Sequence, residues 1–312
     1  MKLHSSSSIT CHASRHSLNC IASTARASSR CVASTFPLGP LQLTARRPVQ
    51  PARSAEGDVP QLDQDWREFR RKLLAQEKPE YKGRESEMNM ELLRIQDPSL
   101  AAEGVWAHPT TTIEQGGVLL ATIRAPEILM QDRMEQVVIF ILSHKPEGSL
   151  GLILNRPSGQ LLGKGRGGVR FPIANAPDRM QETFADSRVY VGGFTAQNFF
   201  HMMHPHDLPG SVKVLDGIYM GGVSAAVDKV ATGKLPPSSF KFFSGAVVWE
   251  PKQLEREIKA GCWYTAACSR SLVLKPCLQL PTPLWREMLL LMGGEFFEVA
   301  QDAYEGDEVS GE

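Results

Sequence analysis

The sequence predicts a mixed, strongly curved α+β domain, because three patterns in its second half agree on this class. Two apolar runs, Val137–Ser143 and Leu150–Leu154, have the composition of strands that are covered on both faces. The turn Lys145–Gly148 between them, with proline second and glycine fourth, predicts an antiparallel hairpin. The other predicted strands and helices follow in irregular order, without the regular βαβ repeat of a doubly wound sheet.

The remaining elements predicted for this domain are short. The strand segments are mainly apolar, and most of the helix segments have proline or glycine at their ends. We expect strands at Val118–Ile123, Val189–Val191, Val212–Leu215, Phe240–Val248 and Ser271–Leu274, and helices at Ser224–Gly233, Glu250–Gly261 and Thr282–Gly293. The hairpin should end at Asn155-Arg156-Pro157, because proline has no N–H to donate to a ladder.

Residues 1–53 have the composition of an organelle-targeting segment. They contain seven Lys and Arg residues and no Asp or Glu, and Ser, Thr and Ala are frequent. The segment has no apolar core of the kind found in secretory signals. Its high Ser and Thr content and loosely spaced Arg favour plastid over mitochondrial import, and a native disordered tail is the alternative. We therefore expect a disordered, cleaved transit peptide and localisation in the chloroplast stroma.

The formal net charge of zero hides an asymmetry between this leader and the rest of the chain. The leader takes seven of the 34 basic residues, which leaves 27 basic against 34 acidic residues. An acidic protein lacks the cationic surface that nucleic-acid phosphates require, so we expect no specific nucleic-acid binding. No apolar run approaches the ~18 residues of a membrane span, so we expect no such span.

The chain divides into four parts by composition. After the transit peptide, residues 54–112 form a charged extension with one amphipathic helix around Leu62–Leu73 and then a linker marked by Pro and Gly. The domain proper is expected at 113–297. An acidic, frayed tail is expected at 298–312.

Several stretches of the domain resemble the AlgH/YqgE family. They are Gly117–Ala121, the block Val137–Pro157 ending in Asn-Arg-Pro, the Gly192-Gly193 pair, Trp249–Trp263, and Leu284-Trp285 in the last helix. The resemblance covers about residues 113–297. It implies a bifurcated sheet curled into a pseudo-barrel with flanking helices. The family has no established biochemical function, although one bacterial member is named as a regulator of alginate synthesis and is sometimes called a transcriptional regulator.

The chain departs from the pattern of the family that it resembles at three places. Phe194 stands where proline is usual, Met134 or a neighbour where an aromatic residue is usual, and Val248-Trp249 where Gly-Trp is usual. His204, by contrast, fits the family pattern.

Familiar motifs of catalysis and nucleotide binding fail on their context. Gly163–Gly168 satisfies G-x-G-x-x-G, but no helix follows it, so we expect a flexible surface loop. The sequence around Ser149 resembles an esterase elbow, but a strand follows the serine where a helix is needed. His144 should face Ser149 across the turn, and Asn155 should face about Val138, which places His144 and Asn155 on the order of 20 Å apart.

Histidine and cysteine supply few candidates for metal ligands. The densest set is His201, His204, His206 and Asp207. Pro205 interrupts this set, so a solvated loop is expected and a metal site is the alternative. The cysteines that follow the leader, Cys262, Cys268 and Cys277, fit no zinc motif. We expect free thiols, no metal and no cofactor.

Asn155-Arg156 is the polar feature that best suits a ligand site, because it follows a buried strand at a place where ligands often bind. Its structural alternative is a strand terminator with Arg156 on the surface. We add His204, Gly192 and Gly193 as ligand-binding candidates and identify no catalytic residue. The sequence favours a non-enzymatic binding or regulatory protein that acts on an unknown stromal protein or small-molecule ligand. The alternatives are a hydrolase with an unrecognised polar cleft and a transcriptional regulator.

Overall fold

The computed structural model describes residues 84–165, 167–169 and 177–305. The predicted transit peptide, the helix predicted around Leu62–Leu73 and the end of the predicted acidic tail lie outside the described residues.

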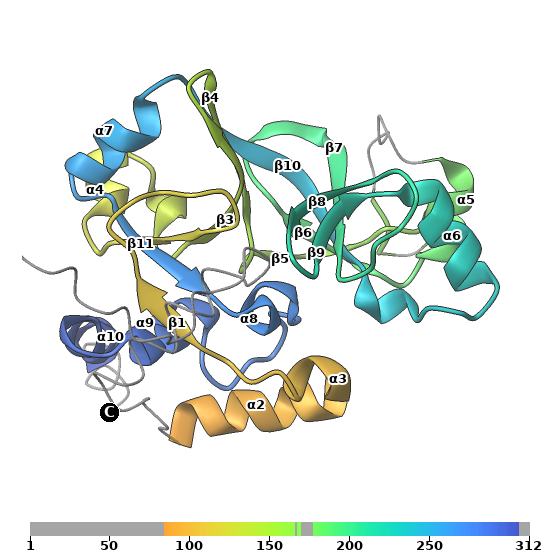
Figure 1. The fold of residues 1–312 in the computed structure, drawn as a ribbon, viewed down its shortest axis with the longest axis horizontal. Coiled ribbons are helices and arrows are strands. Elements are labelled where there is room, and N and C mark those ends of the chain that lie inside the picture. The colour runs from red at the N-terminus through yellow and green to blue at the C-terminus, as the bar shows by residue number, and fades with distance from the viewer. Residues whose placement is uncertain (1–83, 166, 170–176, 306–312) are drawn as a thin grey trace, which may run out of the picture. The chain divides into compact units, whose positions relative to one another are not determined.

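The strands of the described chain join one sheet of eleven strands (Figure 1). Its main path runs β1-β11-β2-β3-β4-β10-β7-β9-β8, and β5 and β6 branch off beside β10. The strands are β1 (Ala107–Pro109), β2 (Val118–Ala121), β3 (Val138–Lys145), β4 (Gly148–Ile153), β5 (Pro157–Leu161), β6 (Arg188–Val191), β7 (Thr195–His204), β8 (Ser211–Leu215), β9 (Ile218–Gly221), β10 (Lys241–Trp249) and β11 (Trp263–Cys268). Because β1 and β8 are the ends of this path, the sheet is not closed into a barrel. The mixed α+β class and the bifurcated sheet are as predicted.

The sheet branches at β10, because this strand changes its neighbour along its length. Near its start, Phe242–Ser244 pairs in parallel with β6. Near its end, Val247–Trp249 pairs with β4 in the antiparallel sense. On its other edge β10 pairs with β7, with a register shift between Ser244 and Ala246. Gly245 occupies this shift at φ +69°, a backbone conformation that glycine adopts without strain.

Gly192 and Gly193 lie in the fork of the sheet. The Gly192 N–H donates to the Ser244 carbonyl at 2.8 Å, and the Gly192 carbonyl accepts from Ile153 N at 2.8 Å. A Cβ on Gly193 would lie 1.9 Å from the carbonyl carbon of Ala246, which no side chain can tolerate. The pair is glycine because three backbone segments meet there.

The central hairpin of β3 and β4 has the predicted register beside its turn, and the register shifts by one residue between Ile141 and Ser143. His144 faces Ser149, and Ile139 faces Ile153. The apolar residues of the hairpin are buried on both sides, which accounts for the continuous apolar pattern.

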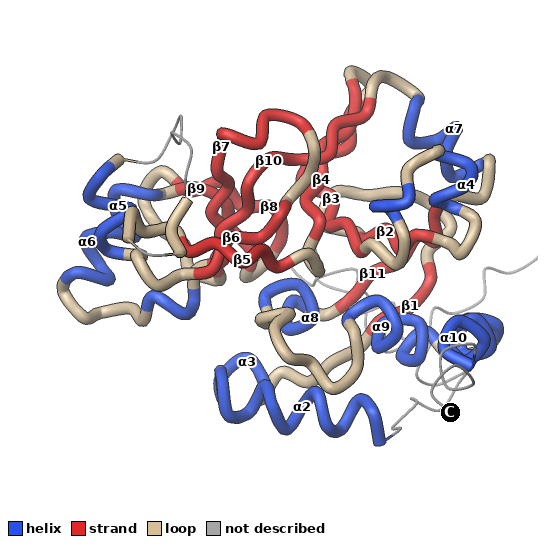
Figure 2. Tube along the Cα trace, turned by 180° about the vertical axis from the view of Figure 1, so that it is seen from behind, coloured by secondary structure: helices blue, strands red, loops and turns tan. Residues whose placement is uncertain are grey.

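The helices cover the sheet in groups, and each group encloses an apolar cluster (Figures 1 and 2). The first group packs around Trp285 and consists of α8 (Arg270–Leu274), α9 (Leu284–Met292) and α10 (Glu295–Glu305). The second packs around Trp249 and consists of α4 (Ala125–Leu129) and α7 (Gln253–Lys259), with the 3-10 helix η1 (Asp132–Met134) beside them. The third packs around Phe184 and consists of α5 (Asp178–Thr183) and α6 (Val223–Ala231), with η2 (Pro237–Ser239) nearby.

Two predictions about elements inside the domain are wrong. Residues 271–274, predicted as a strand, belong to helix α8, because a short apolar run fits one turn of buried helix as well as it fits a strand. His201 and His204, expected in a solvated loop, lie in β7, and His204 is fully buried. The polar residues in the first half of β7 hid its strand pattern.

Two predictions at the ends of the domain are also wrong. The segment expected as a linker carries helices α2 (Arg84–Gln96) and α3 (Pro98–Ala101) and strand β1. Helices α2 and α3 lie beside α8 (Figure 1), and Asn89 of α2 forms hydrogen bonds with Thr282 and Glu287 of the domain. The tail expected to fray begins instead as helix α10, which starts at Glu295 and anchors Ala300 in the core.

Candidate functional site

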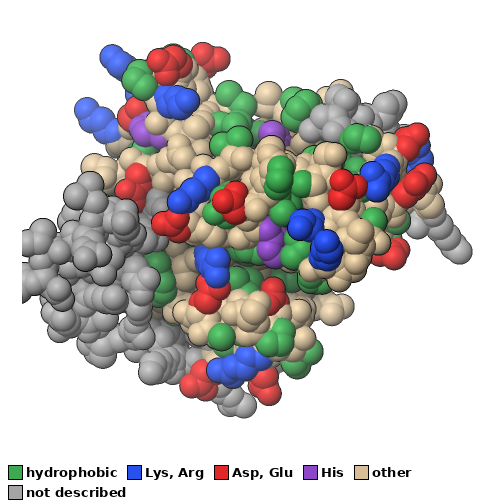
Figure 3. Space-filling view, turned by 45° about the vertical axis from the view of Figure 1, so that its right-hand side comes forward, with side chains coloured by type: hydrophobic (Ala, Val, Ile, Leu, Met, Phe, Trp, Pro, Cys, Tyr) green, Lys and Arg blue, Asp and Glu red, His purple; other side chains and the backbone are tan. Residues whose placement is uncertain are grey.

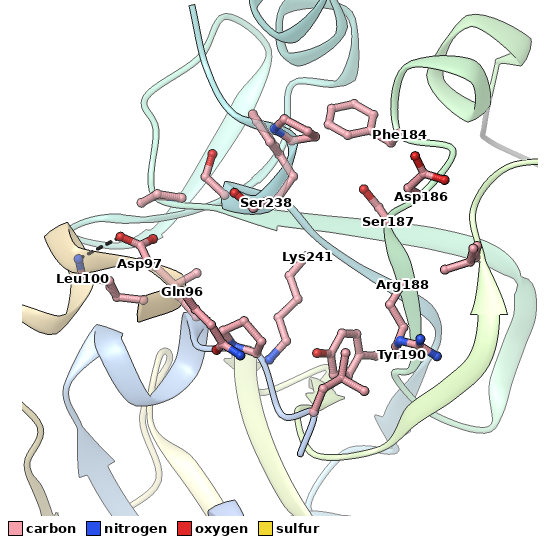
Figure 4. Close-up of a pocket in the computed structure, with 18 of the residues that line it drawn as sticks. Gln96, Asp97, Leu100, Phe184, Asp186, Ser187, Arg188, Tyr190, Ser238 and Lys241 are labelled. Carbon is pink, nitrogen blue, oxygen red and sulfur yellow. Dashed lines mark hydrogen bonds between the residues drawn. The ribbon is translucent and has the colours of Figure 1, made fainter. Parts of the chain in front are cut away.

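A pocket of about 630 Å³ beside the branch of the sheet is the candidate functional site (Figure 4). Its walls come from segments that are far apart in the sequence. They are the end of α2 with α3, the segment from Glu182 to Tyr190, the segment from Pro237 to Lys241, and the segment after α8. A site of this volume suits a small molecule.

Three hydrogen-bond donors line this pocket from one face of the sheet. In the parallel ladder of β6 and β10, Tyr190 is the register partner of Phe243. Register partners point to the same face of a sheet, and every second residue of a strand returns to that face. Arg188, Tyr190 and Lys241 therefore share one face, and Figure 4 shows all three at the pocket.

Lys241 carries a buried ammonium group. The residue is 7% exposed, and its Nζ donates to the carbonyl oxygens of Lys275 at 3.1 Å, Val273 at 3.4 Å and Leu154 at 3.5 Å. Cys277 Sγ lies 3.9 Å from Nζ. Among the described residues, no carboxylate forms an ion pair with Nζ. Burial lowers the pKa of Lys241 because the charged form loses hydration.

Tyr190 and Arg188 complete this donor group. Tyr190 Oη accepts a hydrogen bond from Cys277 N at 3.2 Å, and the tyrosine ring lies 4.6 Å from Lys241 Nζ. Burial raises the pKa of Tyr190 above its usual range, so the hydroxyl keeps its proton and can donate it. Arg188 Nη1 donates to Ser158 O at 2.7 Å.

The carboxylates that line the pocket are mostly exposed or already engaged. Asp97 caps α3 by accepting from Leu100 N at 3.0 Å. Glu103 accepts two hydrogen bonds from the guanidinium of Arg270. Glu182 and Asp186 are exposed. Water and salt screen the exposed carboxylates.

A buried polar contact fastens α2 and α3 to the domain. Asn89 of α2 donates from Nδ2 to Glu287 Oε2 at 2.7 Å and to Thr282 O at 2.8 Å, and its Oδ1 accepts from Thr282 N at 3.0 Å. Glu287 is also ion-paired with Lys275, and the two side chains are 0% and 1% exposed. The extension is therefore part of the frame of the pocket.

The side chains of Asn155 and Arg156 are engaged with the loop before β3, outside the pocket. Asn155 Oδ1 accepts from Val138 N at 3.0 Å, and Asn155 Nδ2 donates to Gln136 O at 2.8 Å. Gln136 has a positive φ of 48°, so these bonds hold a strained backbone. Arg156 Nη2 donates to Glu135 O. These contacts support the structural alternative, and a ligand-binding role for either residue remains a prediction.

Asn155→Ala is expected to destabilise the protein by about 1–3 kcal/mol, because it leaves a backbone donor and acceptor of the loop without their partner. Chemical denaturation of the variant and the wild type measures this difference. Gln160→Ala, which shortens a half-buried amide side chain in β5, is the matched control. Equal stability of Asn155→Ala and the wild type would remove the structural role.

The sequence-predicted histidine cluster is only partly brought together. His204 Nε2 lies 2.9 Å from Gly221 O, which can only accept, so this nitrogen carries the proton. The His204 and His206 rings lie 6.1 Å apart, and His206 Nε2 lies 3.0 Å from Ser239 Oγ. Within the described ranges no group of three or more His, Cys, Asp or Glu could hold a metal ion.

The buried His204 and the half-buried His201 and His206 predict a loss of stability in acid. Burial lowers the pKa of His201, His204 and His206, so the unfolded chain binds protons before the folded chain does. The free energy of unfolding should therefore fall as pH falls through about 6.5, the ordinary histidine value. Urea denaturation between about pH 7.5 and 5.5, above the range of ordinary carboxyl groups, measures the slope. His204→Gln should flatten it, and a flat wild-type profile would contradict the assignment.

A second, smaller pocket of about 200 Å³ lies between η1, α7 and the end of β10. The three positions that depart from the family pattern, Phe194, Met134 and Val248-Trp249, all line it. Arg133 stacks over the Phe194 ring at 3.8 Å. The indole nitrogens of Trp249 and Trp263 both donate to Glu257 Oε2, at 2.9 and 2.8 Å, which ties α7 to the sheet.

The pocket residues Arg188, Tyr190 and Lys241 were missed by sequence reasoning. One signal was present, because Lys241 interrupts the aromatic run Phe240–Phe243 of a predicted buried strand. A charged residue at a core position is seldom fully buried without a specific partner. Arg188 and Tyr190 carry no such signal, since they become a site only through the parallel pairing of β6 with β10.

The protein is an α+β domain built around a bifurcated sheet with flanking helices. A pocket large enough for a small molecule lies beside the fork. A family model described as AlgH-like matches residues 121–297, so the chain belongs to the AlgH-like family. The segment 84–120, with α2, α3 and β1, lies outside the matched range.

Bacterial proteins share this similarity over most of their length. A UPF0301 protein of Chlorobium luteolum is 30% identical over 175 residues, covering 55% of this chain and 84% of the relative. One from Pelodictyon phaeoclathratiforme is 28% identical over 191 residues, covering 60% and 91%. The solution structure of the AlgH protein from Pseudomonas aeruginosa matches with 23% identity and a TM-score of 0.42, covering 57% of this chain and 86% of that chain.

Proposed function

We propose that this chain is a non-enzymatic binding protein of the plastid stroma that holds a small molecule in the pocket beside β6 and β10. The observation that supports this is that Arg188, Tyr190 and Lys241 all line one pocket. Backbone groups fix two of these side chains, Lys241 through three carbonyls and Tyr190 through an amide. Side chains that are fixed in this way need no rearrangement when a ligand binds, and Tyr190 keeps its hydroxyl proton as a donor. The acid-free leader is the basis for the plastid assignment.

A retention experiment tests the binding proposal. Purified full-length protein is incubated with a small-molecule extract of plastid stroma, freed of unbound compounds by gel filtration, denatured, and analysed by mass spectrometry. Ser238→Trp places a large side chain on the pocket wall, and Ser224→Trp makes the same change on the exposed face of α6. We expect compounds that the wild type and Ser224→Trp retain and Ser238→Trp loses. Identical retention by all three proteins would contradict the proposal.

A hydrolase is the second candidate, and one contact favours it. His144 Nδ1 lies 2.7 Å from Ser149 Oγ, and His144 Nε2 lies 3.8 Å from Glu255 Oε1. The order of these groups resembles a serine–histidine–acid relay. Ser149 is only 6% exposed, however, and it lies within the β3–β4–β10 ladder, where its backbone is paired on both sides. We expect no labelling of Ser149 by a fluorophosphonate probe, and labelling that His144→Gln abolishes would favour the hydrolase.

Sequence-specific DNA binding is not expected. Figure 3 shows acidic and basic side chains interspersed over the face in view, without a continuous basic patch there. None of the described helices is long and apolar enough to cross a membrane. A gel shift that survives about 150 mM salt and competitor DNA would favour the transcriptional-regulator alternative, because non-specific contacts weaken steeply with salt.

A further inference from the structure

We propose that the ligand of the pocket carries an oxyanion, a carboxylate or a phosphate, that binds between Arg188, Tyr190 and Lys241. The inference rests on the proposed function and adds the chemical class of the ligand and the residues that recognise it.

Among the described residues, no carboxylate forms an ion pair with the buried Lys241. The two lysines at this place are both buried and joined by a hydrogen bond from Lys241 Nζ to Lys275 O. The Lys275 ammonium is neutralised by Glu287, which is buried with it. Around Lys241 Nζ, the described residues place three carbonyl oxygens, the Cys277 sulfur and the rings of Tyr190 and Phe243, and no carboxylate. A buried cation without a counter-charge is costly, and an anion in the adjoining pocket reduces that cost.

Tyr190 and Arg188 supply hydrogen-bond donors to a ligand in the pocket. Tyr190 accepts through Oη from Cys277 N, and its own proton has no acceptor among the described contacts, so it remains available to a ligand. Arg188 uses Nη1 on Ser158 O, and among the described side chains it forms no ion pair. A guanidinium and a phenol on the same face of β6 supply directional donors, and Lys241 supplies the charge behind them.

The carboxylates at the entrance and the volume of the pocket limit the size of the ligand. Glu182 and Asp186 line the outer part of the pocket and are exposed, so an extended polyanion would meet like charge at the entrance. A small molecule with one anionic end can place that end inside while salt and water screen the outer carboxylates. The pocket volume of about 630 Å³ agrees with a small metabolite.

Matched pairs of probes test the ligand class by isothermal titration of the full chain at low ionic strength. The anionic probes are succinate and glycerol 3-phosphate, and the neutral partners are dimethyl succinate and glycerol. We expect binding of at least one anionic probe and of neither neutral partner. A preference between succinate and glycerol 3-phosphate distinguishes a carboxylate from a phosphate ligand.

Three variants assign the binding to these residues. Arg188→Gln should lower the affinity for the anionic probe about tenfold or more, since hydrogen bonds to charged groups are strong. Tyr190→Phe keeps the ring and removes only the hydroxyl, and it should lower the affinity for the probe several-fold. Arg179→Gln removes an exposed arginine outside the pocket, paired with Asp228, and should change nothing. Thermal melts of each variant check that it is folded.

The outcomes separate the ligand class from the proposed function. The proposal that the ligand carries an oxyanion is overturned if the neutral probes bind. It is also overturned if the compounds whose retention depends on the pocket are all uncharged or cationic. In both cases the proposed binding function still stands. Anionic binding that Arg188→Gln and Tyr190→Phe leave unchanged also overturns the oxyanion proposal. Failure of both anionic probes together with no pocket-dependent retention overturns the binding function itself.

Discussion

Lys275→Met is expected to destabilise the protein by about 3–5 kcal/mol, because it leaves the Glu287 carboxylate buried without its cation. The two side chains are 1% and 0% exposed, so water cannot replace the lost partner. Among the described residues, the Glu287 carboxylate then keeps only the hydrogen bond from Asn89 Nδ2. Equilibrium unfolding in urea measures the loss, and the midpoint should fall while the transition remains cooperative.

The matched control removes both charges. In Lys275→Met/Glu287→Leu no charge stays buried, so most of the lost stability should return, as it does when buried ion pairs are replaced by apolar side chains. If the single and the double variant were equally unstable, the loss would come from packing and the ion-pair account would be wrong. Because Asn89 joins this pair, the double variant should also loosen α2, which hydrogen exchange can detect.

Gly193→Ala is expected to cost about 3 kcal/mol or more, because the added methyl group meets backbone rather than a movable side chain. Its Cβ would lie 1.9 Å from Ala246 C and 2.4 Å from Val247 N. Relief requires β6 and β10 to separate at the fork of the sheet. The expected result is a large fall in the unfolding midpoint or failure to fold.

Gly159→Ala is the control for this substitution. Gly159 lies in β5, and nothing stands within 4 Å of a Cβ built on it. Its substitution should leave stability unchanged or slightly raised, since alanine restricts the unfolded chain. A Gly193→Ala protein as stable as Gly159→Ala would show that the fork is looser than described.

The parts of the fold that follow from local patterns were predictable from the sequence. The hairpin of β3 and β4 was correct in position and in its register beside the turn, because most of its apolar residues are buried and its turn fixes the pairing there. Helix α9 was also correct, from the proline before it and the glycines after it. The predictions at β7 and α8 were wrong, because contacts with distant segments decide the structure of these two stretches.

The candidate site could not be predicted, because it depends on non-local pairing. Arg188 and Lys241 lie 53 positions apart by number and become neighbours only through the parallel pairing of β6 with β10. Asn89, which holds one wall in place, lies in a segment that composition assigned to a linker. Asn155-Arg156, by contrast, was visible in the sequence as a polar cluster, and its described contacts hold the loop before β3.

An NMR titration of the isotope-labelled full chain with whichever of succinate and glycerol 3-phosphate binds more tightly locates the binding site. It compares the pocket with the segment Asn155-Arg156. If the pocket is the binding site, the resonances that move are those of Arg188, Tyr190 and Lys241 and their neighbours, and Tyr190→Phe reduces the movement. Movement confined to Asn155, Arg156 and the loop before β3, with the pocket resonances unchanged, would contradict the account.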